Sequence, residues 1–133
     1  MTQEDKELLM KDLSARLSYG VRYKHFTWDD EHGETCIAAQ IYSINTDGYV
    51  KNSYDDETDY IDNVRPYLFP LSSLTEEQKE EYVALQQRVI YNGRGLVNLD
   101  VMKYVNWCYK HHIDINGLIE KGFAIDATGS GIY

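Results

Sequence analysis

The chain has few of the residues that mark a disulfide scaffold, and it has no long hydrophobic run. Cys36 and Cys108 are its only cysteines, and they do not form a CxxC pair. Without a secretory signal, both are expected to be reduced core residues. No apolar run approaches the ~20 residues that cross a bilayer, and the acidic start of the chain is not a signal peptide. We therefore expect a cytoplasmic protein.

Positive charge is scarce as well. Thirteen lysines and arginines stand against 22 aspartates and glutamates, which gives a net charge of −9. A surface of this sign repels nucleic acids and anionic membranes, so direct binding to either is not expected. A basic protein is the partner that such a charge would attract.

The whole imbalance lies in residues 25–64, which contain ten acids and the single base Lys51. Most of these acids fall in two connections, 29–34 and 55–62, rather than in strands, which favours a solvated or partner-facing rim. The predicted acidic rim consists of Asp29, Asp30, Glu31, Glu34, Asp55, Asp56, Glu57, Asp59 and Asp62.

The periodicity predicts one α+β domain, with a small antiparallel sheet of three to four strands packed against three main helices. Residues 2–17 form the first helix, because Thr2 and Asp5 resemble a capping box ahead of an apolar stripe. A second helix begins after Thr75 and extends to about Tyr91, where residues 92–95 end it.

Three short strands are predicted between the first two helices. Residues 19–23 alternate in polarity, and Phe26 and Trp28 allow the strand to extend further. Residues 35–44 and 49–51 follow, separated by an Asp-Gly turn. Residues 60–64 form either a fourth edge strand or a short turn of helix. Residues 65–71 contain both prolines and form an extended connector.

The last third is predicted to be helical. Asn98 can cap a helix whose apolar stripe reaches His112, with His111 near its C-terminus. Asp114 can cap a short helix over residues 115–121. A short strand over residues 123–125 and a loose glycine-rich tail complete the chain.

Three runs, residues 8–21, 65–81 and 106–126, resemble a group of small proteins of gut anaerobic bacteria and their prophages and mobile elements. The similarity frames nearly the whole chain and is weakest over residues 25–64. The group has no known activity, so the resemblance implies a bacterial or phage cytoplasmic setting and no site residues.

The sequence contains no known metal-binding motif. The candidate nitrogen and sulfur ligands have no spacing of a known zinc site, and His111 and His112 point to different helix faces. The acids of residues 55–62 lack the alternation, central glycine and final glutamate of a calcium loop. No metal and no cofactor is therefore predicted. The candidate ligands considered are His25, His32, His111, His112, Cys36 and Cys108.

Nucleophilic catalysis has one weak candidate, in which Cys108 lies one helical turn before His112. Both are expected on the core face, where cysteine is commonly inert. The glycine-containing segments match neither a phosphate loop nor a nucleophile elbow. The chain is therefore not expected to be an enzyme.

Three hypotheses remain from the sequence. The preferred one is a non-enzymatic protein-interaction or accessory module of a bacterium or its mobile element. The second is an acidic mimic of nucleic acid that inhibits a DNA-binding protein, although carboxylates clustered at turns fit a regular phosphate array poorly. The third is a small ligand-binding protein with a pocket lined by Tyr104, Cys108 and His112.

Overall fold

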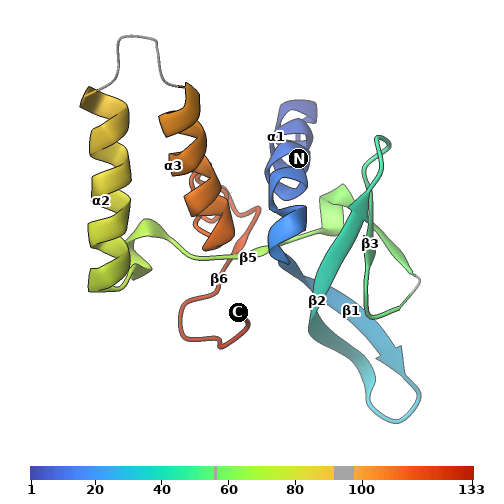
Figure 1. The fold of residues 1–133 in the computed structure, drawn as a ribbon. Helices are drawn as coiled ribbons and strands as arrows, with labels where there is room; N and C mark the ends of the chain where they lie inside the picture. Colours follow the sequence, from blue (N-terminus) through green and yellow to red (C-terminus); the bar gives the residue numbers. More distant parts are fainter. Residues whose placement is uncertain (56, 92–97) are drawn as a thin grey trace.

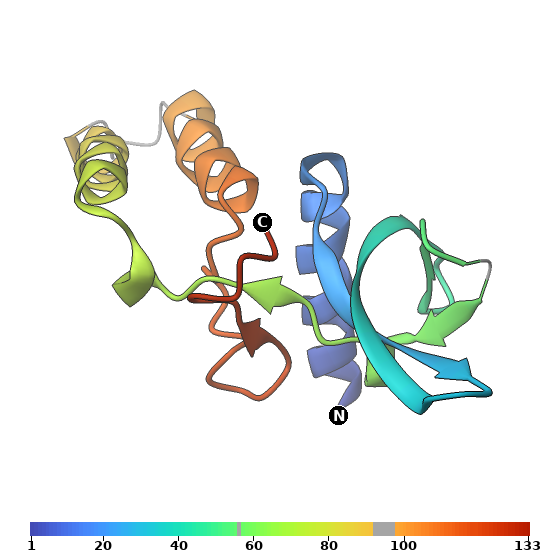
Figure 2. The ribbon, with the colours of Figure 1, turned by 90° about the horizontal axis from the view of Figure 1, so that it is seen from below.

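The computed structural model describes residues 1–55, 57–91 and 98–133 of the chain. Within these ranges, three α-helices, a curled four-stranded antiparallel sheet and a two-stranded parallel sheet form the α+β fold that the sequence predicts (Figure 1). The first helix, α1, lies along the curled sheet, and the other two helices stand together on the far side of α1 (Figure 2).

The helix α1 spans Gln3–Arg16 and begins at the predicted capping box. The Thr2 hydroxyl accepts a hydrogen bond from the Asp5 amide at 3.1 Å, and the Asp5 carboxylate accepts one from the Thr2 amide at 3.0 Å. Leu9 and Leu13 are fully buried and pack against the sheet. The sequence therefore specifies both the start and the buried face of this helix.

The four-stranded sheet is a simple meander in which each strand pairs with the next in antiparallel fashion. The Asn45 side chain accepts hydrogen bonds from two amides in the turn before the third strand, and Gly48 supplies a φ of 89°. Both alternatives for residues 60–64 occur in succession, a strand followed by a 3₁₀ turn over Ile61–Asn63. The strands are β1 Arg22–Asp29, β2 Gly33–Ile44, β3 Tyr49–Asn52 and β4 Thr58–Tyr60.

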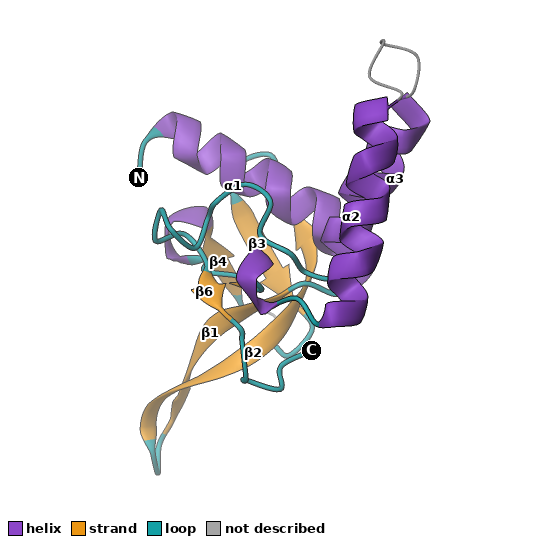
Figure 3. Ribbon diagram, turned by 90° about the vertical axis from the view of Figure 1, so that its left-hand side faces the viewer, coloured by secondary structure: helices purple, strands orange, loops and turns teal. Residues whose placement is uncertain are grey.

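The hairpin of β1 and β2 extends beyond the core as a twisted arm (Figure 3). Its inner part is buried, with Tyr23 paired to Ala39, whereas its outer part is exposed. The buried alternation of β1 continues through His25, while Phe26 and Trp28 are exposed. The arm therefore carries a buried polar residue where hydrophobic packing ends.

The proline-containing connector is extended, as predicted. Its strand β5, Tyr67–Leu68, pairs in parallel with β6, Ile125–Asp126, which overlaps the strand predicted over residues 123–125 at Ile125. The tail after β6 is not loose: the Tyr133 hydroxyl donates to the Tyr67 carbonyl and accepts from the Arg22 amide, both at 2.8 Å. That expectation was wrong because an aromatic residue anchors the end of the chain.

The helices α2, Glu76–Tyr91, and α3, Asn98–Lys110, lie side by side (Figure 1). Thr75 and Gln78 form the predicted capping box of α2, with hydrogen bonds of 3.0 and 3.1 Å. The predicted terminator over residues 92–95 lies outside the described residues.

Two predictions after α3 were wrong. The helix ends at Lys110, so His112 lies beyond it, with a φ of 60°. Residues 115–121 form turns instead of a helix. Asp114 behaves like a cap, because its carboxylate accepts hydrogen bonds from the Leu118 and Ile119 amides at 2.9 Å, but no helix follows. Gly117, at a φ of 69°, turns the backbone away from helical geometry.

Candidate functional site

A buried histidine, His25, lies at the centre of the polar network of the sheet. The alternation of β1 turns it inward next to Tyr23, and only 1% of its surface is exposed. Its Nδ1 atom lies 2.6 Å from a carboxylate oxygen of Asp59, and its Nε2 atom lies 2.9 Å from one of Asp55. Both ring nitrogens of His25 therefore face acidic side chains.

The two carboxylates reach His25 because Asn52, at the end of β3, shapes the connection to β4. Its side-chain oxygen accepts hydrogen bonds from the Tyr54 and Asp55 amides at 2.9 Å. Its side-chain nitrogen donates to the Tyr23 hydroxyl at 3.0 Å and to Asp55 at 3.2 Å. Asn52 is 1% exposed, so these bonds satisfy a buried amide and fix Asp55 in place.

The proton positions follow from the chemistry of the partners. Carboxylate oxygens only accept hydrogen bonds, so both His25 nitrogens carry hydrogen and the ring is an imidazolium. Burial alone would lower the pKa of His25, but the hydrogen bonds to Asp55 and Asp59 outweigh it and the pKa lies above its ordinary value. The hydrogen bond from His25 in turn lowers the pKa of Asp55.

Tyr23 also belongs to this network. Its hydroxyl donates to Asp59 at 2.5 Å and accepts from Asn52. Burial, reinforced by the bond to Asp59, raises the pKa of the Tyr23 phenol, so it stays protonated and acts as a donor. The network thus joins β1, the end of β3 and β4 through the side chains of Tyr23, His25, Asn52, Asp55 and Asp59.

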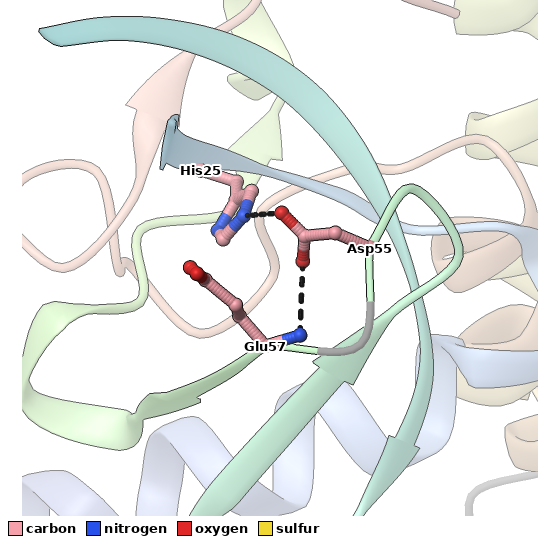
Figure 4. A group of neighbouring side chains, drawn as sticks. All are labelled: His25, Asp55 and Glu57. Atoms are coloured by element: carbon pink, nitrogen blue, oxygen red, sulfur yellow. Dashed lines mark hydrogen bonds and ion pairs between the residues drawn. The ribbon is translucent and has the colours of Figure 1, made fainter. Parts of the chain in front are cut away.

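Glu57 stands beside His25 and Asp55 (Figure 4). One ligand atom from each of the three residues lies within 4.8 Å of the other two. The Asp55 carboxylate also accepts a hydrogen bond from the Glu57 amide at 3.1 Å, which holds the two acids together. An imidazole nitrogen and two carboxylate oxygens at this spacing form a donor set that can hold a divalent metal ion.

A groove of about 530 Å³ opens next to this cluster, between the outer part of the β1–β2 hairpin and the connection from β3 to β4. Thr27 and Thr35 lie across from each other in it, with their hydroxyls 2.8 Å apart. No lysine or arginine is among its described lining residues. These are Phe26, Thr27, Trp28, Asp29, Glu34, Thr35, Ile37, Tyr54, Asp55 and Glu57.

The predicted acidic rim is divided by the structure. Asp59 turns inward to His25, and Asp62 pairs with Lys6 of α1 at 3.5 Å. Asp30 and Glu31 are exposed at the tip of the hairpin. Asp56 lies outside the described residues. The four acids that line the groove are Asp29, Glu34, Asp55 and Glu57.

The predicted pocket of Tyr104, Cys108 and His112 is a packed region. Cys108 is fully buried in a hydrophobic cluster that Tyr104 packs against, and the Tyr104 hydroxyl is 2.9 Å from that of Tyr82. Burial raises the pKa of Cys108 to about 11, which opposes thiolate formation. His112 stacks on the Tyr133 ring at 3.6 Å, so the structure gives all three side chains packing roles.

From the sequence, His25 was predicted only as an isolated candidate metal ligand, without its carboxylate partners. The parity of β1, in which Tyr23 and His25 share a face, is the signal that could have placed it inward. Its meeting with Asp55 and Asp59 depends on how the connection from β3 to β4 folds, which no local pattern specifies.

Comparison with known proteins adds no assignment: no family model matches the chain, and no curated protein or solved structure matches it.

Proposed function

We propose that the protein is a non-enzymatic interaction module whose groove docks a basic segment of a partner protein. The observation that carries this proposal is the lining of the groove, where four carboxylates gather without a lysine or arginine among the described lining residues. The groove lies in the segment that holds the entire −9 net charge of the chain.

The negative charge, the exposed Tyr54 ring and the fixed wall of the groove all favour a cationic peptide. The potential of the acids draws a basic segment towards the groove, an effect that weakens with salt. Tyr54 lines the groove and is 64% exposed, so its ring is accessible to a lysine or arginine side chain. The polar network of Asn52 and Asp55 holds one wall in place, which reduces the ordering cost of binding.

A nucleic-acid mimic is less well supported by this geometry. A mimic requires carboxylates at regular spacing along an extended surface, whereas Asp59 is turned inward and Asp62 pairs with Lys6. The remaining acids form a short groove and a hairpin tip. These positions match the regular phosphate spacing of DNA poorly.

The cellular setting of the proposal rests on the resemblance to proteins of gut anaerobes and their mobile elements. On this basis, we propose a partner among the cytoplasmic proteins of such a bacterium or of the element itself. Within the described residues, no helix is long and apolar enough to cross a membrane.

The test measures binding of a short, fluorescently labelled peptide rich in lysine and arginine by anisotropy, at low and at physiological salt. We expect binding at low salt that weakens with added salt. The double variant Asp29→Asn/Glu34→Gln should weaken it by roughly three- to tenfold, because two favourable charge contacts are removed.

The matched control is Glu77→Gln/Glu80→Gln, which removes the same charge from exposed positions of α2. It should change the affinity by less than about twofold, since these acids are far from the groove. Equal losses in both double variants, or no binding at low salt, would contradict a specific docking groove.

A further inference from the structure

We propose that His25, Asp55 and Glu57 bind one divalent transition-metal ion, with Zn²⁺ as the best match, at the inner end of the groove. The inference does not require that the groove docks a peptide. It assigns a second role to Asp55 and Glu57, which the docking proposal uses as two of the four groove carboxylates, and a ligand role to His25, which does not line the groove.

The donor geometry is close to that of a zinc site. One imidazole nitrogen and two carboxylate oxygens lie within 4.8 Å of one another (Figure 4). Around a zinc ion with bonds near 2.0–2.2 Å, tetrahedral ligand atoms are about 3.3 Å apart. Glu57 is exposed, so its side chain can close this difference. Nε2 of His25 and the Asp55 oxygen lie 2.9 Å apart, so they must separate by about 0.4 Å to admit the ion between them.

The surrounding hydrogen bonds orient the ligands as they do in established metal sites. Asp59 lies 2.6 Å from Nδ1 of His25, which fixes the tautomer that leaves Nε2 for the metal. Asn52 holds one oxygen of Asp55 while the other oxygen faces Nε2 of His25. A histidine whose second nitrogen is bound by a carboxylate is a recurrent feature of zinc ligation.

The local charge also favours a cation. Three carboxylates, those of Asp55, Glu57 and Asp59, surround a single imidazolium. The ion pairs that the described structure gives to Asp55 and Asp59 are with His25 alone. A divalent ion that displaces the proton between Nε2 and Asp55 would replace one positive charge by two, and the proton would leave to solvent.

The imidazole decides the class of metal. Magnesium and calcium prefer six or more oxygen ligands, whereas imidazole nitrogen suits zinc and its neighbours. Three protein ligands leave at least one coordination position for water or for a ligand in the groove, as in zinc sites that remain accessible. We therefore expect selectivity for Zn²⁺ over Mg²⁺ and Ca²⁺.

The experiment is a calorimetric titration of the full chain with Zn²⁺, followed by titrations with Mg²⁺ and Ca²⁺. We expect one equivalent of zinc to bind with micromolar or tighter affinity and the other two ions to give no comparable binding. The His25 ring nitrogens are followed by NMR, where Nε2 should lose its hydrogen and change shift while Nδ1 keeps its own.

Glu57→Gln tests the site without disturbing the buried network, because Glu57 is exposed. It should weaken zinc binding at least tenfold. The matched control is Glu34→Gln, which removes the same charge from the same groove but lies outside the cluster. It should change zinc affinity less than about twofold, as expected for a charge without a ligand bond.

Asp59→Asn tests the orienting role, and a loss of 10- to 100-fold in zinc affinity is expected for a partner of a ligating histidine. Thermal melting of each variant confirms that it is folded. The proposal is overturned if zinc does not bind, if Glu57→Gln binds as tightly as the native chain, or if the His25 resonances do not move. Because the peptide test uses Asp29 and Glu34 without metal, failure of one proposal does not imply failure of the other.

Discussion

At the scale of single residues, His112 shows how the fold holds an ionisable group in its neutral form. It is the one non-glycine residue with positive φ in the described part of the chain, and only 9% of it is exposed. Its ring stacks on Tyr133, and its Nδ1 atom is buried without a hydrogen-bond partner among the described residues. Burial, together with the positive charges of Arg16 and His111, lowers the pKa of His112 to about 4.

This lowered pKa predicts a pH dependence of stability. In the unfolded chain the pKa of His112 returns to about 6.5, so between that pH and about 4 the unfolded state binds a proton that the folded state does not. The free energy of unfolding should therefore fall as the pH falls through this window. The contribution of His112 is up to about 3 kcal/mol and is complete above pH 6.5.

Urea denaturation across this pH range, with the native chain and His112→Asn, provides the measurement. Asparagine tolerates positive φ but does not titrate, so the variant should show a shallower fall. Other groups, including His25 with its raised pKa and the carboxylates with lowered pKa, are present in both proteins and cancel in the difference. Parallel curves would show that His112 titrates equally in both states.

At the scale of elements, a buried ion pair joins α1 to the turn after α3. Arg16 donates to the Asp12 carboxylate at 2.6 and 3.1 Å and to the Ile113 carbonyl at 2.6 Å. Asn116 donates to the same carboxylate at 2.8 Å. Arg16 and Asp12 side chains are fully buried, so removal of either leaves an uncompensated charge.

Arg16→Met and Asp12→Leu should each destabilise the fold by about 3–5 kcal/mol, because each leaves the buried charge of its partner unpaired. The double variant should cost clearly less than the sum of the two, since no charge is then left unpaired. Chemical denaturation of the four proteins in a double-mutant cycle measures the coupling. Additive losses would mean that the two charges are solvated independently.

The elements that the sequence predicted correctly are those with local causes. Thr2 with Asp5, and Thr75 with Gln78, are capping pairs within one turn of helix. The turn before the third strand likewise forms locally, through the Asn45 side chain and the positive φ of Gly48. The short helix after Asp114 failed because the local signal was used differently. The carboxylate of Asp114 satisfies two amides of a turn and leaves no helix to propagate.

The candidate site was predicted only in part, for a physical reason. Asp29, Glu34, Asp55 and Glu57 are acidic in any fold, so composition found them. His25 enters the site through strand parity combined with the folding of the Asn52 loop, and this contact joins residues 30 or more positions apart. A single sequence contains no signal for such a meeting.

At the scale of the whole molecule, charge is unevenly distributed. Residues 25–64 hold the net −9 charge and form most of the curled sheet, at the opposite end from the α2 and α3 pair (Figure 1). The groove and the proposed metal site share this end and share Asp55 and Glu57. Their occupants are therefore expected to influence each other.

Zinc should weaken the binding of a basic peptide. The bound ion adds two positive charges and releases one proton, so the inner end of the groove gains one positive charge. Loss of one favourable charge contact corresponds to about a two- to fivefold lower peptide affinity. By thermodynamic linkage, the peptide should lower zinc affinity by the same factor.

Peptide anisotropy with and without saturating zinc, and zinc calorimetry with and without saturating peptide, measure the two sides of this linkage. In Glu57→Gln, a zinc concentration that saturates the native chain but lies below the weakened dissociation constant of the variant should change peptide affinity much less, because most of the variant then holds no ion. If zinc instead tightens peptide binding in the native chain, a peptide group must occupy the open coordination position of the metal. Bridging of this kind would replace charge competition as the relation between the two sites.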